Sequence, residues 1–185
     1  MGFRMLRSAA ALVAVVLLAG CVPGDPVVTP EPDPEVTPVF ASDEEALAAA
    51  TEAYARYLEV SDQIAADGGA DPERMIPLVT EDQYQRELEG FTNLVDSNLR
   101  IVGSSAYDST AIQSWSMVDA NSAQVVIYAC SDASSTRVLD DTGTDVTPVD
   151  RRVRAPFELE FVSSSEDAFS LVLARSDLWS GTDFC

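Results

Sequence analysis

The hydrophobic pattern changes its period once, near residue 99, and this change constrains the fold more than any other feature of the chain. Before it, apolar residues recur every three or four positions, as on one face of a helix; they are Leu47, Ala50, Tyr54, Tyr57, Leu58 and Ile64. After it, short runs rich in Val, Ile, Thr and aromatic residues alternate with Ser, Gly and Asp turns. Helices followed by a series of antiparallel strands predict an α+β domain.

Three helices are expected before the change. Ser42 with Glu45, and Thr80 with Gln83, form capping-box pairs that predict the starts of the first and third helices. Pro72 suits the first position of a helix and predicts a short second helix between them.

Six strands are expected after it. They lie near 99–106, 110–118, 123–131, 135–139, 152–162 and 167–177. Alternation predicts an inward row of Phe157, Leu159, Phe161, Phe169, Leu171 and Leu173. The intervening Glu158 and Glu160, with Arg152 and Arg154 upstream, predict a charged ladder in water.

The N-terminal residues are predicted to form an export signal. Arg4 and Arg7 precede an uncharged run at 8–20, which as a helix covers roughly 20 Å, too short for a bilayer core of about 30 Å. Residues 1–20 are therefore predicted to be a signal peptide. The run ends in Leu18-Ala19-Gly20-Cys21, which resembles the lipobox of bacterial lipoproteins. The resemblance implies cleavage before Cys21 and a membrane anchor through lipid on its thiol, the alternative being an ordinary cleaved signal.

A proline-rich, acidic segment follows the cysteine. Residues 22–41 hold six of the ten prolines, four acidic residues and no basic one. Such a segment favours polyproline II and extends about 60 Å at ~3.1 Å per residue. We predict a disordered tether over 21–41 and a globular domain over 42–185.

The charge balance excludes several classes of partner and reaction. The chain has 31 acidic and 11 basic residues, a net charge of −20, and no His. Nucleic acid is excluded because its binding requires clustered cations, and anionic membrane surfaces would repel the domain. A cationic partner is allowed, while the acidity also serves solubility. Without His, Ser-His-Asp catalysis and most zinc sites are excluded, and neither a cofactor nor a metal is predicted.

Two cysteines are left once Cys21 carries lipid. In an oxidising compartment Cys130 and Cys185 have one intramolecular pairing, which would fasten the C-terminus to a strand. A reactive pair or an intermolecular disulfide is the alternative.

Three helices packed in the concave side of a curved antiparallel sheet resemble the nuclear-transport-factor-2-like fold, a cystatin-like cone. Tyr128-Ala129-Cys130 and the C-terminal Cys185 resemble short actinobacterial lipoproteins that carry this fold behind a proline-rich tether. The resemblance implies a fold rather than an activity, because most such proteins have no known one.

Candidate site residues fall into three groups. A ligand pocket could be lined by aromatic residues, namely Tyr54, Tyr84, Phe91, Trp115, Phe157 and Trp179. Carboxylate and tyrosine chemistry inside the cone, as in the ketosteroid-isomerase branch, could use Tyr54, Tyr57, Tyr84, Tyr107, Tyr128, Asp108 and Asp119. The acidic loop at 140–145 lacks the following Glu of a calcium-binding hand, which favours a hairpin turn.

The leading hypothesis is a tethered, non-catalytic module at the cell envelope that binds a small hydrophobic ligand or an envelope protein. The alternatives are an envelope enzyme that uses carboxylate and tyrosine groups and a purely structural envelope component. No oligomeric state is predicted.

Overall fold

The computed structural model describes residues 37–185, and the predicted signal peptide and Cys21 lie outside the described residues. The predicted α+β class is confirmed. The helices are α1 (Asp43–Ala66), the 3-10 helix η1 (Pro72–Leu78) and α2 (Glu81–Ser97). The strands are β1 (Arg100–Val102), β2 (Ala106–Asp119), β3 (Ser122–Asp132), β4 (Arg137–Leu139), β5 (Arg154–Ser163) and β6 (Leu171–Leu178). Within residues 37–185 no helix is long and apolar enough to cross a membrane.

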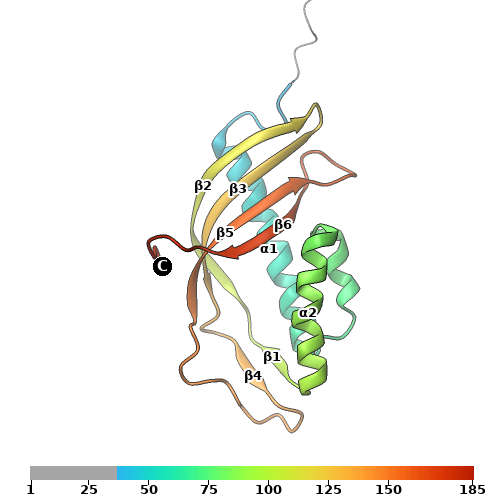
Figure 1. The fold of residues 1–185 in the computed structure, drawn as a ribbon, viewed down its shortest axis with the longest axis vertical. Helices are drawn as coiled ribbons and strands as arrows, with labels where there is room; N and C mark the ends of the chain where they lie inside the picture. Colours follow the sequence, from blue (N-terminus) through green and yellow to red (C-terminus); the bar gives the residue numbers. More distant parts are fainter. Residues whose placement is uncertain (1–36) are drawn as a thin grey trace, which may run out of the picture. The chain divides into compact units, whose positions relative to one another are not determined.

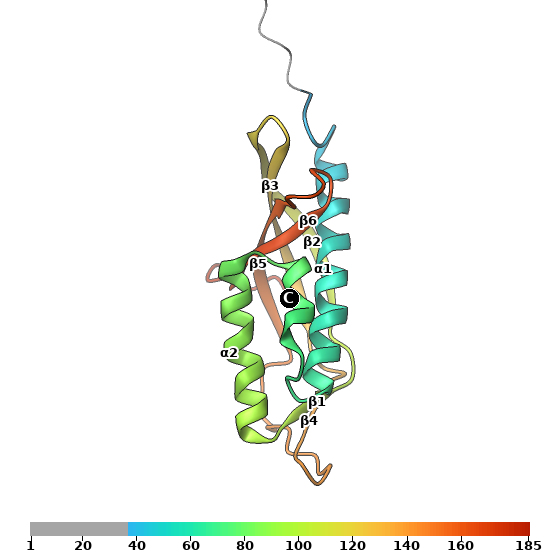
Figure 2. The same cartoon turned by 90° about the vertical axis from the view of Figure 1, so that its right-hand side faces the viewer.

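The strands form two separate antiparallel sheets. A four-stranded sheet has the order β2-β3-β5-β6, and β1 pairs with β4 in a second, two-stranded sheet (Figure 1). In the large sheet every neighbouring pair is antiparallel. The views in Figures 1 and 2 place α1 along one face of this sheet and α2 beside the β1–β4 end.

The core lies between α1 and the inner face of the large sheet. Alternate residues of β3 from Ala123 to Ala129 are fully buried, as are Leu159 and Phe161 of β5. Helix α1 faces them with small residues and two tyrosines; the buried set includes Ala46, Ala50, Ala53, Tyr54 and Tyr57. The inward row predicted for β5 is therefore present, with Phe157 partly buried at its end.

Both predicted helix starts are present. Ser42 Oγ accepts a hydrogen bond from Glu45 N at 3.3 Å, and the Glu45 carboxylate accepts one from Ala41 N at 2.7 Å. Thr80 Oγ1 accepts one from Gln83 N at 3.4 Å. These caps satisfy amides that the first helical turn leaves unpaired.

Two expectations need correction. The packed domain begins before residue 42, because Val39 and Phe40 are 5% and 2% exposed and join the core although we assigned them to the tether. Phe169 was predicted to point inward but is 61% exposed. It lies in the turn that precedes β6, where the strand alternation has not begun.

Gly69 fixes the reversal that follows α1. It has φ of +87°, and a Cβ built on it would lie 2.2 Å from the carbonyl oxygen of Phe91 in α2. Only glycine permits this backbone conformation together with such close contact to a second helix.

We therefore expect Gly69→Ala to lower the free energy of unfolding by about 2 kcal/mol or more, through left-handed strain and steric overlap. Gly90→Ala is the matched control, because Gly90 lies within α2 and a Cβ there meets nothing within 4 Å. It should raise stability by roughly 0.5–1 kcal/mol. Urea unfolding of both variants measures the difference, and equal midpoints would contradict the prediction.

Candidate functional site

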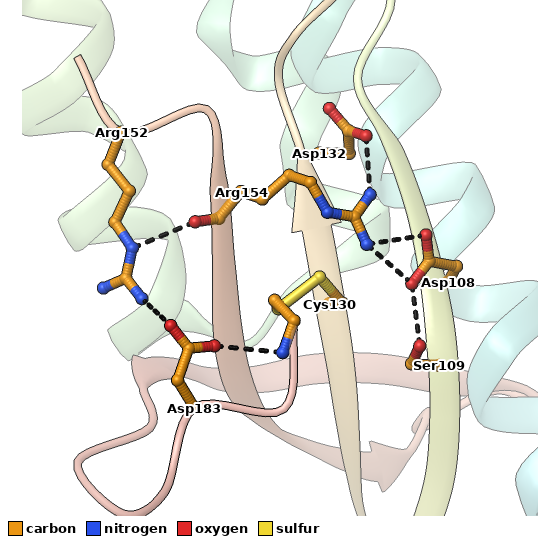
Figure 3. The surroundings of a disulfide bond; sticks show 8 residues. Asp108, Ser109, Cys130, Asp132, Arg152, Arg154 and Asp183 are labelled. Atoms are coloured by element: carbon orange, nitrogen blue, oxygen red, sulfur yellow. Dashed lines mark hydrogen bonds and ion pairs between the residues drawn. A yellow bond between two sulfur atoms is a disulfide. The ribbon is translucent and has the colours of Figure 1, made fainter. Parts of the chain in front are cut away.

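The C-terminal segment lies on the outer face of the large sheet, where a disulfide holds it. Cys130 of β3 and Cys185 are bonded, with their Cα atoms 5.5 Å apart, which confirms the predicted intramolecular pairing (Figure 3). Trp179 and Phe184 pack edge-on against Tyr128, with ring centroids 4.9 and 5.9 Å from it. The chain end thus covers the outer side of β3.

Arginine bridges neutralise carboxylates around this disulfide. Arg154 contacts Asp132 at 2.7 Å and Asp108 at 2.9 Å, and Arg152 contacts Asp183 at 2.8 Å (Figure 3). Hydrogen bonds from the side chain and the backbone N–H of Ser134, followed by one from Arg154, lower the pKa of Asp132 to about 2. The ion pairs of Arg154 therefore link β5 to β3 and β2 on the outer face of the sheet.

The predicted charged ladder is also largely paired. Arg175 of β6 contacts Glu158 at 3.3 Å and Glu160 at 3.0 Å, and the two glutamate side chains are only 19% and 20% exposed. The ladder therefore forms a cross-strand network rather than a freely solvated face.

A buried polar cluster joins α1 to α2. Tyr57 Oη donates to Glu87 Oε1 at 2.7 Å, and Gln83 Nε2 donates to the same oxygen at 2.6 Å. Burial, followed by the charge of Glu87, raises the pKa of Tyr57 well above its ordinary value, and burial raises the pKa of Tyr54 to about 12. Among residues 37–185 no buried side-chain polar atom lacks a hydrogen-bond partner.

The six aromatic candidates do not converge on one pocket. Tyr54 and Phe91 belong to the core, whereas Trp179 lies on the outer face against Tyr128. The other three, Tyr84, Trp115 and Phe157, pack against the core from different elements. Two surface hollows, of about 650 and 580 Å³, are lined by none of these six aromatic residues.

The structure brings three of the candidates for acid–base chemistry together, because the Tyr54 ring lies 5.9 Å from that of Tyr57 and 5.0 Å from that of Tyr107. Their polar groups and the aspartates are bound elsewhere. Tyr107 Oη donates to the Thr51 carbonyl oxygen at 3.1 Å, Asp108 is bound by Arg154, and Asp119 ends β2. Asp140 accepts hydrogen bonds from the backbone of Thr142 and Thr144, which makes the 140–145 segment a turn. Within residues 37–185 no group of carboxylates and cysteines has the geometry to hold a metal ion.

The two edges of the large sheet differ. The edge of β6 is covered by the chain itself, because Thr80 N donates to the Leu173 carbonyl oxygen at 2.9 Å. Arg86 Nη2 donates to the Ala174 carbonyl oxygen at 2.9 Å. Two adjacent β6 carbonyls on this edge are therefore occupied, and a further strand could not pair with them.

The edge of β2 is open. This strand of 14 residues pairs only with β3, and no strand among the described residues lies on its other side. Ten consecutive residues, 109–118, carry no charge, with Asp108 and Asp119 at either end. Three register irregularities interrupt the pairing with β3 and leave Ser114 to Met117 as its longest regular stretch.

Trp115 lies on this edge beside the first turn of α1. Its Nε1 donates to Asp43 Oδ1 at 2.8 Å, and its ring meets Phe40 edge-on at 5.9 Å. Asp43 and Glu44 are exposed. The neighbouring Val118 is 62% exposed. We call Trp115, Asp43, Glu44 and the 114–118 edge the Trp115 edge; it offers unpaired backbone, an aromatic ring and two carboxylates.

Sequence reasoning placed Trp115 in a pocket and missed its position at an open edge. The sequence does contain a signal for this open edge, namely the run 109–118, which has no charged residue. Such a run stands out because almost a quarter of the residues of this chain are charged. Charged side chains are one of the devices that protect edge strands from pairing, and this stretch of β2 lacks them.

No protein-family model and no curated protein matches the chain. Among solved structures, the intermembrane space region of the chloroplast protein ARC6 is similar, with a TM-score of 0.51 and 11% identity over 73% of this chain and 97% of that one. A periplasmic fragment of TraM has a TM-score of 0.45 and 9% identity over 77% of this chain and 100% of that one. The likeness to ARC6 concerns the α+β fold alone.

Loss of the disulfide should release the C-terminal segment and destabilise the fold. The bridge spans 55 residues, and replacing both cysteines by Ala should cost about 4 kcal/mol on the chain-entropy model. Denaturant unfolding with and without reductant measures the loss. Reductant should have no effect on the double variant, and an unchanged midpoint in reduced native protein would contradict the prediction.

Asp132 should contribute to stability in acid. Its pKa is lowered to about 2 in the folded chain and is about 3.9 when unfolded. Its contribution is therefore complete above pH 4 and is lost as the pH falls through 2. We expect the melting temperature of Asp132→Asn to depend less on pH between 4 and 2 than that of the native chain. Parallel thermal melts test this, and identical slopes would contradict it.

Proposed function

We propose that this chain is a membrane-tethered, extracytoplasmic lipoprotein that acts as a non-catalytic protein-interaction module. Lipid on Cys21 would anchor it, and the proline-rich segment that follows would carry the domain up to about 60 Å from the membrane. Three features support this location, namely the predicted signal peptide, the resemblance to a lipobox and the Cys130–Cys185 disulfide, which an oxidising compartment favours.

The observation that carries the interaction role is the contrast between the two sheet edges. Thr80 and Arg86 bind two adjacent carbonyls of β6, whereas the edge of β2 has an uncharged stretch, 109–118, that contains Trp115. An exposed strand edge is a template for pairing with another chain, and tryptophan is enriched among residues that dominate interface energy.

We further propose that the domain belongs to the nuclear-transport-factor-2-like class. Three N-terminal helices followed by an antiparallel sheet support this assignment, with α1 lying along the inner face. In this arrangement α1 and the aromatic side chains fill the interior, so the functional surface would lie outside the core.

Site-specific photocrosslinking in intact cells tests the role. A photoreactive residue at Ser116, which is exposed on β2, should crosslink an envelope protein when placed in the full chain. The matched position is Thr92, exposed on α2 away from the edge, and it should give no equivalent product.

The same cells test the anchor. Cys21→Ser should move the chain out of the membrane fraction and remove the Ser116 product, because the module would no longer be held near its partner. Equal products from positions 116 and 92 would contradict an interaction surface at β2. Retention of the Cys21→Ser chain in the membrane would contradict the lipid anchor.

A further inference from the structure

We propose that the Trp115 edge binds a short, extended, basic peptide segment, which adds to β2 as a fifth strand of the large sheet. The proposal rests on the interaction function above and specifies its partner. Strand addition uses backbone hydrogen bonds for affinity and alternate side chains for specificity.

The backbone of β2 defines the binding register. Four consecutive residues, from Ser114 to Met117, pair regularly with β3 and keep the ladder geometry that a further strand requires. They span about 13 Å at ~3.3 Å per residue, which suits a segment of four to six residues. The irregularities on both sides bend the strand and limit the length of the partner.

The side chains of β2 define the two faces of the partner. Ser114 and Ser116 are exposed and small, so the outer face of an added strand meets little steric resistance. On the other face Trp115 and Met117 are partly buried and pack against the core. Partner side chains on that face would lie beside the indole ring and would gain from being apolar or from stacking a guanidinium on it.

The carboxylates beside the edge favour a basic partner. Asp43, whose carboxylate accepts the Trp115 indole N–H, and Glu44, which follows it in the first turn of α1, are both exposed. Neither takes part in an ion pair among residues 37–185. Hydrogen bonds from the backbone of Glu44 and the side chain of Ser42 lower the pKa of Glu44, which keeps it ionised. Asp119 adds a third carboxylate at the end of β2.

The same charges disfavour a second copy at this edge. Each chain carries a net charge of −20, so pairing β2 with β2 of another copy would bring two strongly acidic surfaces together. Residues 22–36 of the chain itself are also poor occupants, because their frequent prolines lack the N–H groups that a strand ladder needs.

A peptide titration against the full chain in detergent tests the proposal. The probe is a capped heptapeptide, Thr-Arg-Val-Arg-Val-Arg-Thr, with hydrogen–deuterium exchange and fluorescence anisotropy as readouts. We expect slower exchange within 113–118 of β2. The double variant Asp43→Asn/Glu44→Gln should bind about five-fold more weakly at low salt, as expected for loss of two exposed charge pairs.

Two controls separate strand addition from charge attraction. Glu81→Gln/Asp82→Asn removes the same charges from the first turn of α2 and should leave affinity unchanged. The probe methylated on alternate backbone nitrogens keeps its charge but loses strand hydrogen bonds, and it should not slow exchange in β2. Equal binding of both peptides, or protection outside β2, would overturn the proposal.

Native mass spectrometry distinguishes the other occupants. If the chain is a dimer and its β2 amides exchange slowly without peptide, the edge is occupied by a second copy. If the chain is a monomer and these amides already exchange slowly, the edge is occupied by another part of the same chain. Either result would overturn the proposal of a basic peptide. If the peptide fails while position 116 still crosslinks an envelope protein, the interaction function stands and strand addition is rejected. If both fail, the interaction function fails as well.

Discussion

The close packing of α1 on the inner face of the large sheet determines the rest of the structure. Ala46, Ala50 and Ala53 are buried at this interface, and their small side chains let the helix backbone approach the strands. Tyr54 and Tyr57 fill the space near the middle of α1, with their rings stacked at 5.9 Å. Since α1 occupies this face, α2 and η1 must pack elsewhere, against the helix and the β6 side of the sheet.

That constraint explains why only one sheet edge is covered. After α1 the chain reverses at Gly69, and η1 leads into α2 alongside β6, where Thr80 and Arg86 bind the strand carbonyls. No described element remains to cover β2 on the opposite edge. Its register irregularities limit uncontrolled pairing by twisting the strand, while the regular stretch at 114–117 stays available.

Local signals in the sequence were sufficient for the elements but not for their assembly. Capping residues located both long helices, and β-rich runs located six strands, because these features depend on neighbours in the chain. The separate pairing of β1 with β4 and the burial of Phe40 were not predictable in this way. Both depend on contacts between segments that are distant in the sequence. The same is true of the contrast between the open edge at β2 and the covered edge at β6, from which the Trp115 edge was identified.

The positions of the arginine residues determine which carboxylates have an ion-pair partner and which do not. Arg152, Arg154 and Arg175 are bound to carboxylates of the outer sheet face or the chain end, so this face is largely neutralised by its own residues. Asp43 and Glu44 have no such ion-pair partner among residues 37–185. Carboxylates without an ion-pair partner, next to the unpaired backbone of β2, attract cations to an edge that can hydrogen-bond an extended chain. Electrostatics would therefore bring a basic segment to β2, and the backbone ladder would select an extended one.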